Sequence, residues 1–279
     1  INDGVLTVSY EWNNSAGDVL GSSSTLLIDA STTDVGDVIS CTASVTDTHG
    51  ASASSTSTSV VVENTAPTAD SVSITPNTGV YSNSTIDCFG TASDIDDESL
   101  TLSYEWTNFN TNEVLGSDVS LTLSPSDVSP GNQVQCTVTA TDPQGEMSSM
   151  GITVTVENTV PTWSTEATIS PDGGVVTSSV LTCSAVGDDL DDGALSATYA
   201  WSNQNGSALG TGSTLTITEI NSDVGDVVSC TATITDSSGA SLTSSGSVTV
   251  ENTDPLVNTI AIVPDSEVYA GDYLICTAS

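Results

Sequence analysis

The sequence contains no lysine and no arginine, and its one histidine, His49, stands against 36 aspartate and glutamate residues. The formal net charge is therefore −36 at pH 7. Nucleic acids owe most of their affinity for proteins to cationic side chains that neutralise phosphates. Anionic membrane surfaces likewise attract basic segments. The composition excludes nucleic acid as a partner, argues against anionic membranes and leaves metal cations as ions that such a surface attracts.

Long apolar runs are also missing. No stretch reaches 18 consecutive apolar residues, so the sequence predicts no membrane insertion. Catalytic side chains are equally scarce. His49 lies in a loop where the matching positions of two other repeats hold Gln144 and Ser238, and the paired aspartates recur in repeated loops. We therefore predict that the protein is not an enzyme.

What the chain does have is a repeated Cys–Trp–Cys signature with a period of about 94 residues. Two copies are complete, and a third is split between the front and the back of the sequence. The expected modules are an incomplete one at 1–62 that lacks its first two strands, complete ones at 63–156 and 157–250, and the first two strands of a further one at 251–279.

The pattern within a module is that of β-strands. Leu100, Leu102, Tyr104 and Trp106 share one face at period two, and turn residues interrupt the chain every 8–12 residues. No helical period is present. About seven short strands in 94 residues are typical of a β-sandwich, so an all-β fold of tandem sandwiches is expected.

The cysteine and tryptophan positions resemble the immunoglobulin fold, which has a cysteine on its second strand, a core tryptophan on its third and a cysteine on its sixth. The closest style is that of tandem immunoglobulin-like repeats in large microbial surface proteins, with PKD-like and cadherin-like features in the linkers. The resemblance implies disulfides between Cys88 and Cys136 and between Cys183 and Cys230. Zinc is the alternative for the cysteines, but it prefers closely spaced ligand pairs. Paired cysteines indicate an oxidising, extracellular location.

The two partial modules complement each other. If both are numbered from their cysteine, only three positions are missing between Ser279 and Ile1. A head-to-tail neighbour would supply the first two strands to residues 1–62, and its Cys276 would pair with Cys41. Two explanations fit: the sequence is a window onto a longer polypeptide, or separate subunits exchange strands.

An acidic loop precedes each tryptophan strand, and a Glu-Asn-Thr-x-Pro linker joins the modules. Calcium binds six to eight oxygen ligands, which such loops could supply, and the linkers resemble the calcium-binding joints of cadherins. Solvated acidic turns are the alternative. The candidate calcium ligands are Asn2, Asp3, Glu63, Asp94, Asp96, Asp97, Glu157, Asp189, Asp191, Asp192 and Glu251.

Two further features are recorded as expectations. Asn13, Asn83 and Asn205 begin Asn-x-Ser/Thr sequons and are candidate glycosylation sites, although such triplets also occur by chance in a chain rich in Asn and Ser. Trp163 has no counterpart in the other modules and is expected either at an interface or covering a linker.

The sequence therefore predicts a structural segment of an extracellular or cell-surface fibre or stalk that serves adhesion or scaffolding. Its partners are copies of itself arranged head to tail, and a surface ligand is not identified. The alternative is a ligand-binding or carbohydrate-binding accessory region, or a spacer, of a large secreted enzyme or adhesin. Calcium is the one cofactor suggested.

Overall fold

The computed structural model describes residues 6–97 and 99–279, and all the regular secondary structure in this part is β-strand. The expected all-β class is thereby confirmed. The chain divides after Asn158 into two compact units. Within the described residues, no helix has the length and apolar character needed to cross a membrane.

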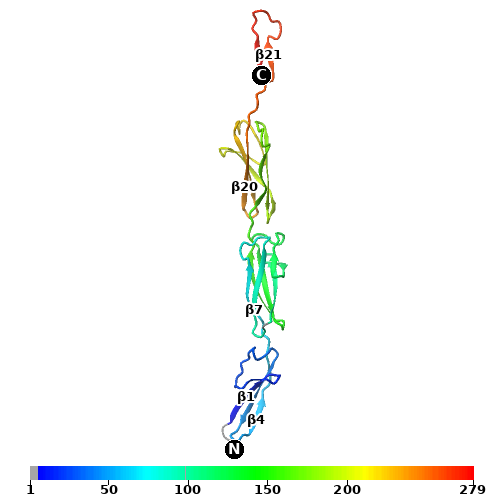
Figure 1. The fold of residues 1–279 in the computed structure, drawn as a ribbon, viewed down its shortest axis with the longest axis vertical. Helices are drawn as coiled ribbons and strands as arrows, with labels where there is room; N and C mark the ends of the chain where they lie inside the picture. Colours follow the sequence, from blue (N-terminus) through cyan, green and yellow to red (C-terminus); the bar gives the residue numbers. More distant parts are fainter. Residues whose placement is uncertain (1–5, 98) are drawn as a thin grey trace. The chain divides into compact units, whose positions relative to one another are not determined.

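Residues 68–156 form a sandwich of two antiparallel sheets that contains β7 in Figure 1. One sheet has the order β10-β7-β6, and the other has the order β12-β11-β8-β9. The strands are β6 (Thr68–Thr75), β7 (Thr85–Ser93), β8 (Thr101–Asn108), β9 (Glu113–Gly116), β10 (Ser120–Thr122), β11 (Gln133–Thr141) and β12 (Met147–Thr155).

Alternation of side chains explains this core. Along β11, the residues at every second position from Val134 to Ala140 are buried, and those between them are only partly covered. Because successive side chains of a strand point to opposite faces, one face of β11 is directed to the core. Trp106 on β8 lies opposite Cys136 in the register and is fully buried. The arrangement is that of an immunoglobulin-like sandwich.

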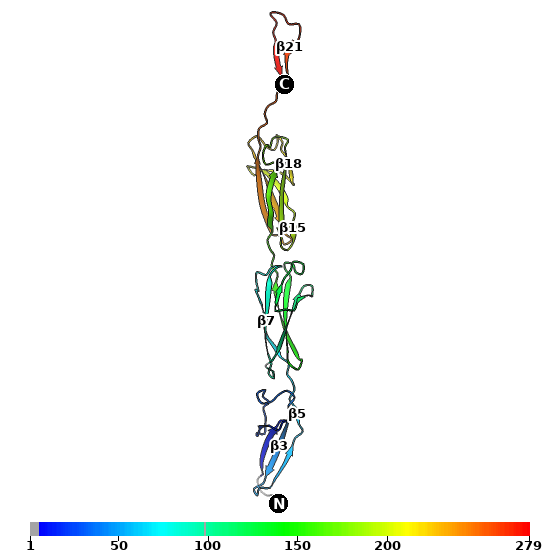
Figure 2. The ribbon, with the colours of Figure 1, turned by 45° about the vertical axis from the view of Figure 1, so that its right-hand side comes forward.

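Residues 162–250 repeat this design in the second unit, with β15 and β18 visible in Figure 2. One sheet has the order β13-β14-β15 with β18 paired to β14, and the other has the order β17-β16-β19-β20. The strands are β13 (Thr162–Ser170), β14 (Val180–Asp189), β15 (Gly193–Leu195), β16 (Thr198–Asn203), β17 (Ala208–Thr211), β18 (Thr214–Thr216), β19 (Val227–Thr235) and β20 (Ser241–Thr249).

The front of the chain forms only one sheet in the part that the structure describes. Its order is β2-β1-β3-β4, and β5 also pairs with β3; β1 and β4 are labelled in Figure 1. The strands are β1 (Thr7–Asn13), β2 (Val19–Gly21), β3 (Val38–Thr46), β4 (Ser52–Thr56) and β5 (Val60–Val61). Trp12 pairs with Cys41 as Trp106 pairs with Cys136, but here the tryptophan is only half-buried.

The last described strands, β21 (Ile260–Val263) and β22 (Ile275–Ala278), form an antiparallel hairpin. Ile262 pairs with Cys276 in this hairpin, as Ile74 pairs with Cys88 between β6 and β7. The hairpin therefore has the register of the first two strands of a complete sandwich.

Candidate metal centre in the acidic loops

The acidic loop between β7 and β8 holds the segment that enters the 68–156 sandwich. The Asp96 carboxylate accepts hydrogen bonds from the backbone N–H of Thr65 at 2.7 Å and from its hydroxyl at 2.5 Å. Asp94 Oδ1 accepts the backbone N–H of Asp96 at 2.7 Å. Two of the three predicted aspartates in this loop therefore have defined structural contacts.

Other oxygen atoms of this cluster are buried without a hydrogen-bond donor. They are Asn64 Oδ1, Asp94 Oδ2 and Asp97 Oδ2. The Asn64 amide also donates to Asp142 Oδ2 at 2.9 Å, which adds Asp142 to the cluster. A buried polar atom without a partner costs free energy, so these oxygens identify a place where positive charge would be stabilising.

The pKa shifts support this interpretation. Burial raises the pKa of Asp97, and repulsion from Asp94, Asp142 and Asp96 raises it further, against a smaller lowering by the Gln144 side chain. Burial also acts to raise the pKa of Asp142, but hydrogen bonds from Asn64 and from the backbone of Glu146, Gly145 and Gln144 lower it overall. Asp97 is thus the carboxylate of this cluster whose charge is least compensated.

The second unit repeats the arrangement. Asp189 is 5% exposed; its Oδ1 accepts the backbone N–H of Asp191 at 2.8 Å, and its Oδ2 is buried without a partner. Asp191 accepts both the N–H and the hydroxyl of Thr159, at 2.8 and 2.7 Å. Asp192 accepts the backbone N–H of Ser237 at 2.8 Å. The same atom of the first loop aspartate is therefore unsatisfied in both sandwiches.

The linker glutamates have a different environment from the one expected. Glu157 Oε1 accepts the backbone N–H of Gly79 at 2.7 Å, and Glu251 Oε1 accepts that of Gly174 at 2.8 Å. Each glutamate therefore binds the turn between the first two strands of its own sandwich, and the structure does not bring it to that sandwich's acidic loop. Glu63 is exposed. Asn2 and Asp3 lie outside the described residues.

Oxygen donors of this kind fit calcium, which is a hard cation that takes carboxylate and amide oxygens. Among the described residues, however, no three His, Cys, Asp or Glu side chains are grouped closely enough to hold a metal ion. The loops present buried, unsatisfied oxygens and not a closed cage. Sequence reasoning missed Asn64 and Asp142; the Asn that recurs in each linker and the Asp that begins each matching hairpin turn were the available signals.

The cysteines are placed as follows. A disulfide joins Cys88 to Cys136 across the two sheets of the first sandwich, and another joins Cys183 to Cys230 in the second. Cys41 and Cys276 are unpaired within this chain.

The candidate glycosylation sites differ in accessibility. Asn83 and Asn205 are exposed in turns, whereas Asn13 ends β1 and is half-buried. Trp163 packs against the core of its own sandwich, and its indole nitrogen is buried without an acceptor.

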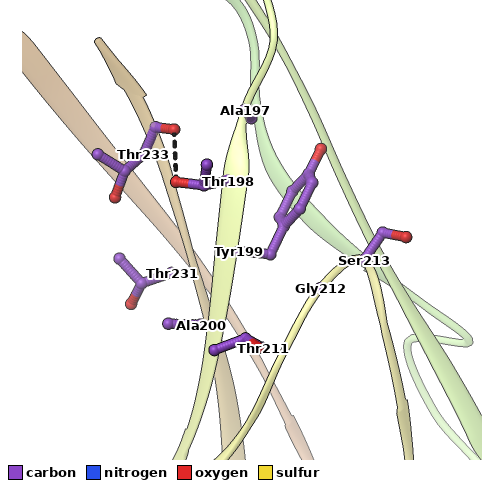
Figure 3. Close-up of a pocket in the computed structure, with 9 residues that line it drawn as sticks. All are labelled: Ala197, Thr198, Tyr199, Ala200, Thr211, Gly212, Ser213, Thr231 and Thr233. Atoms are coloured by element: carbon purple, nitrogen blue, oxygen red, sulfur yellow. Dashed lines mark hydrogen bonds between the residues drawn. The ribbon is translucent and has the colours of Figure 1, made fainter.

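A hollow of about 660 Å³ opens beside the first residues of β16 (Figure 3). Thr198 donates to the carbonyl of Thr233 at 3.2 Å, and the Tyr199 ring lies on the other side of the strand. Ala197 and Ala200 line the hollow with small side chains. No charged residue is among those that line it, which are Ala197, Thr198, Tyr199, Ala200, Thr211, Gly212, Ser213, Thr231 and Thr233.

The chain matches no known family profile and no curated protein sequence. Solved structures do match it. A Ca²⁺-stabilised adhesin with which an Antarctic bacterium binds ice is 16% identical, with 94% of this chain and 70% of that chain covered and a TM-score of 0.36. A 1.5-MDa bacterial ice-binding adhesin is 18% identical, with coverages of 89% and 88% and a TM-score of 0.30.

Cadherin domains 3–6 of protocadherin gamma B2 are 11% identical, with coverages of 100% and 76% and a TM-score of 0.34. These structures are tandem extracellular domains of the expected type. At such identities and TM-scores they carry no argument about what this chain binds.

Proposed function

We propose that this chain is a structural segment of an extracellular or cell-surface fibre or stalk, in which immunoglobulin-like modules follow one another head to tail. The observation that carries the proposal is the repetition of one sandwich design, together with a single sheet at the front and a hairpin at the back that share the register of a complete module. Repetition extends a chain and multiplies identical surfaces, which suits adhesion or scaffolding.

The disulfides support the location. Cys88–Cys136 and Cys183–Cys230 lie in the two sandwich cores, and disulfides persist in oxidising compartments outside the cell. A surface without lysine or arginine also keeps modules of like charge apart, although salt screens this repulsion beyond about 8 Å.

Calcium at the acidic loops is part of the proposal. Asn64, Asp94, Asp97 and Asp142 would hold the ion in the first sandwich, and Asp189 with Asp192 would contribute in the second. Because Asp96 and Asp191 grip the segment that enters each sandwich, ordering the loop around an ion would stiffen that entry.

The calcium proposal is tested by melting the chain with calcium and with chelator at matched ionic strength. Calcium should raise the melting temperature, and magnesium at the same concentration should raise it less because it demands a smaller octahedral shell. Asp70→Asn, which removes an exposed carboxylate outside the loop, should leave the response intact. An unchanged melting temperature on chelation contradicts the calcium site.

A second candidate function is an accessory binding region, and the hollow beside Tyr199 favours it. Its hydroxyl lining suits a neutral oligosaccharide. The matching positions of the first sandwich hold Leu102 and Glu105 in place of Ala197 and Ala200, so the double variant Ala197→Leu/Ala200→Glu copies the filled version. Titration with neutral oligosaccharides should detect binding that this variant abolishes; equal signals from both proteins contradict this function.

Negative-stain images of the assembled protein discriminate between the two candidates. Regular filaments support the fibre or stalk, and isolated flexible particles support the accessory region.

A further inference from the structure

The hairpin of β21 and β22 exposes side chains that a complete sandwich buries. Ile74, Val80 and Ile86 are 5%, 0% and 0% exposed in the first sandwich. Their counterparts, 188 positions later, are 47–55% exposed, although Ile262 keeps the same pairing with a cysteine. These counterparts are Ile262 at 53%, Val268 at 47% and Leu274 at 55%. The hairpin therefore carries an apolar core face that nothing in this chain covers.

The front sheet has the opposite deficiency. Cys136 is fully buried on β11, but its counterpart Cys41 on β3 is only half-buried, and Val8 on β1 is 49% exposed. Figure 2 shows β3 within this sheet. The face that would hold a disulfide and a tryptophan core is open.

A missing strand gives an independent sign of the same vacancy. In the complete sandwiches β10 pairs with β7, and β18 pairs with β14. The matching residues of the front module, Thr25–Leu27, form no strand. The strand is absent because its partner, the second strand of a module, is not supplied by residues 6–62.

We propose that the hairpin of one copy of this chain docks on the front sheet of a second copy, which completes a sandwich and places Cys276 beside Cys41 of that copy. This inference rests on the proposed head-to-tail arrangement and identifies its contact. Leu274 then fills the place of Ile86, and Thr25–Leu27 becomes a strand that pairs with the segment before Cys276, as β10 pairs with β7.

The two thiols form a disulfide when a small disulfide such as oxidised glutathione is the oxidant. Cys41 and Cys276 each lose a proton and together lose two electrons, and oxidised glutathione is reduced to two glutathione thiols. The linkage repeats the Cys88–Cys136 bond between strands of the same rank.

The test uses the full chain with oxidised glutathione and a non-reducing gel. The unmodified chain should give a ladder in multiples of 28.2 kDa. Cys41→Ser and Cys276→Ser should each stay at 28.2 kDa alone, but an equal mixture should stop at a covalent dimer, because one variant retains only the donor cysteine and the other only the acceptor. Peptide mapping should find Cys41 linked to Cys276.

A matched pair of variants separates docking from chance collision of thiols. Ile262→Asp charges the core face of the hairpin and should abolish the ladder, whereas Thr277→Asp places the same charge on its other face and should preserve it. Dimers formed by either serine variant alone as readily as by the mixture overturn the proposal, as does a Cys41–Cys276 bond within one molecule. A preserved calcium response without a ladder overturns this inference alone; loss of both overturns the proposed function as well.

Discussion

Removal of the Cys88–Cys136 disulfide should bring its sandwich close to unfolding. The bond closes a loop of 48 residues, and the chain-entropy relation gives about 4 kcal/mol for a loop of that length. A domain of this size has a total stability of roughly 5–15 kcal/mol. At roughly 4–8 °C per kcal/mol, the melting temperature should fall by about 16–30 °C.

The assay for Cys88→Ala/Cys136→Ala is hydrogen exchange read by mass spectrometry, because it reports on each sandwich separately. Amides of β11 should lose most of their protection, and those of β19 in the other unit should keep theirs. The control Cys183→Ala/Cys230→Ala should reverse this pattern, since that bond closes 47 residues of the second unit. A loss below about 1 kcal/mol in β11 would refute the loop-closure argument.

Three further predictions concern carboxylates. Asp97→Asn should raise the melting temperature in chelator and reduce the calcium response: the pKa of Asp97 is raised, so its contribution to stability is present below its ordinary pKa and lost as pH rises through the raised value; calorimetry with and without calcium measures both effects, and an unchanged response contradicts the site. Asp142→Asn should flatten the acid side of the stability profile, because the pKa of Asp142 is lowered and its contribution is lost as pH falls through that value; urea melts at several pH values test this, and an unaltered acid limb counts against it. Glu157→Ala removes the acceptor of the Gly79 N–H and should cost about 1 kcal/mol at this exposed position; Glu113→Ala on the surface is the control for the same urea melts, and an equal loss in both variants would deny Glu157 this role.

The sandwich fold could be predicted because its determinants are local and repeated. The alternation along β11 and the Cys–Trp–Cys spacing specify two sheets and the strands that face each other. The absence of a strand at Thr25–Leu27 could not be predicted from that segment alone, since it has the same apolar alternation as β10. Strand formation there depends on a partner that is distant in sequence.

The candidate metal site could be predicted only in part. Clustered aspartates between consecutive strands indicate a loop with excess negative charge, and the structure finds unsatisfied oxygens on Asp94, Asp97 and Asp189 there. The roles of Glu157 and Asp142 depend on where the turn containing Gly79 and the linker residue Asn64 come to lie. Those contacts join residues 78 positions apart, which linear spacing cannot reveal.

The most direct test of the central claim, that the modules continue head to tail by completing the front sheet, is hydrogen exchange of β3 as a function of protein concentration. In dilute, reduced protein the amides of 38–46 should exchange faster than those of 133–141, the matching strand of a complete sandwich. With oxidised glutathione and rising concentration they should approach the same protection, together with 25–27. Protection of 38–46 that stays low and independent of concentration would contradict the account.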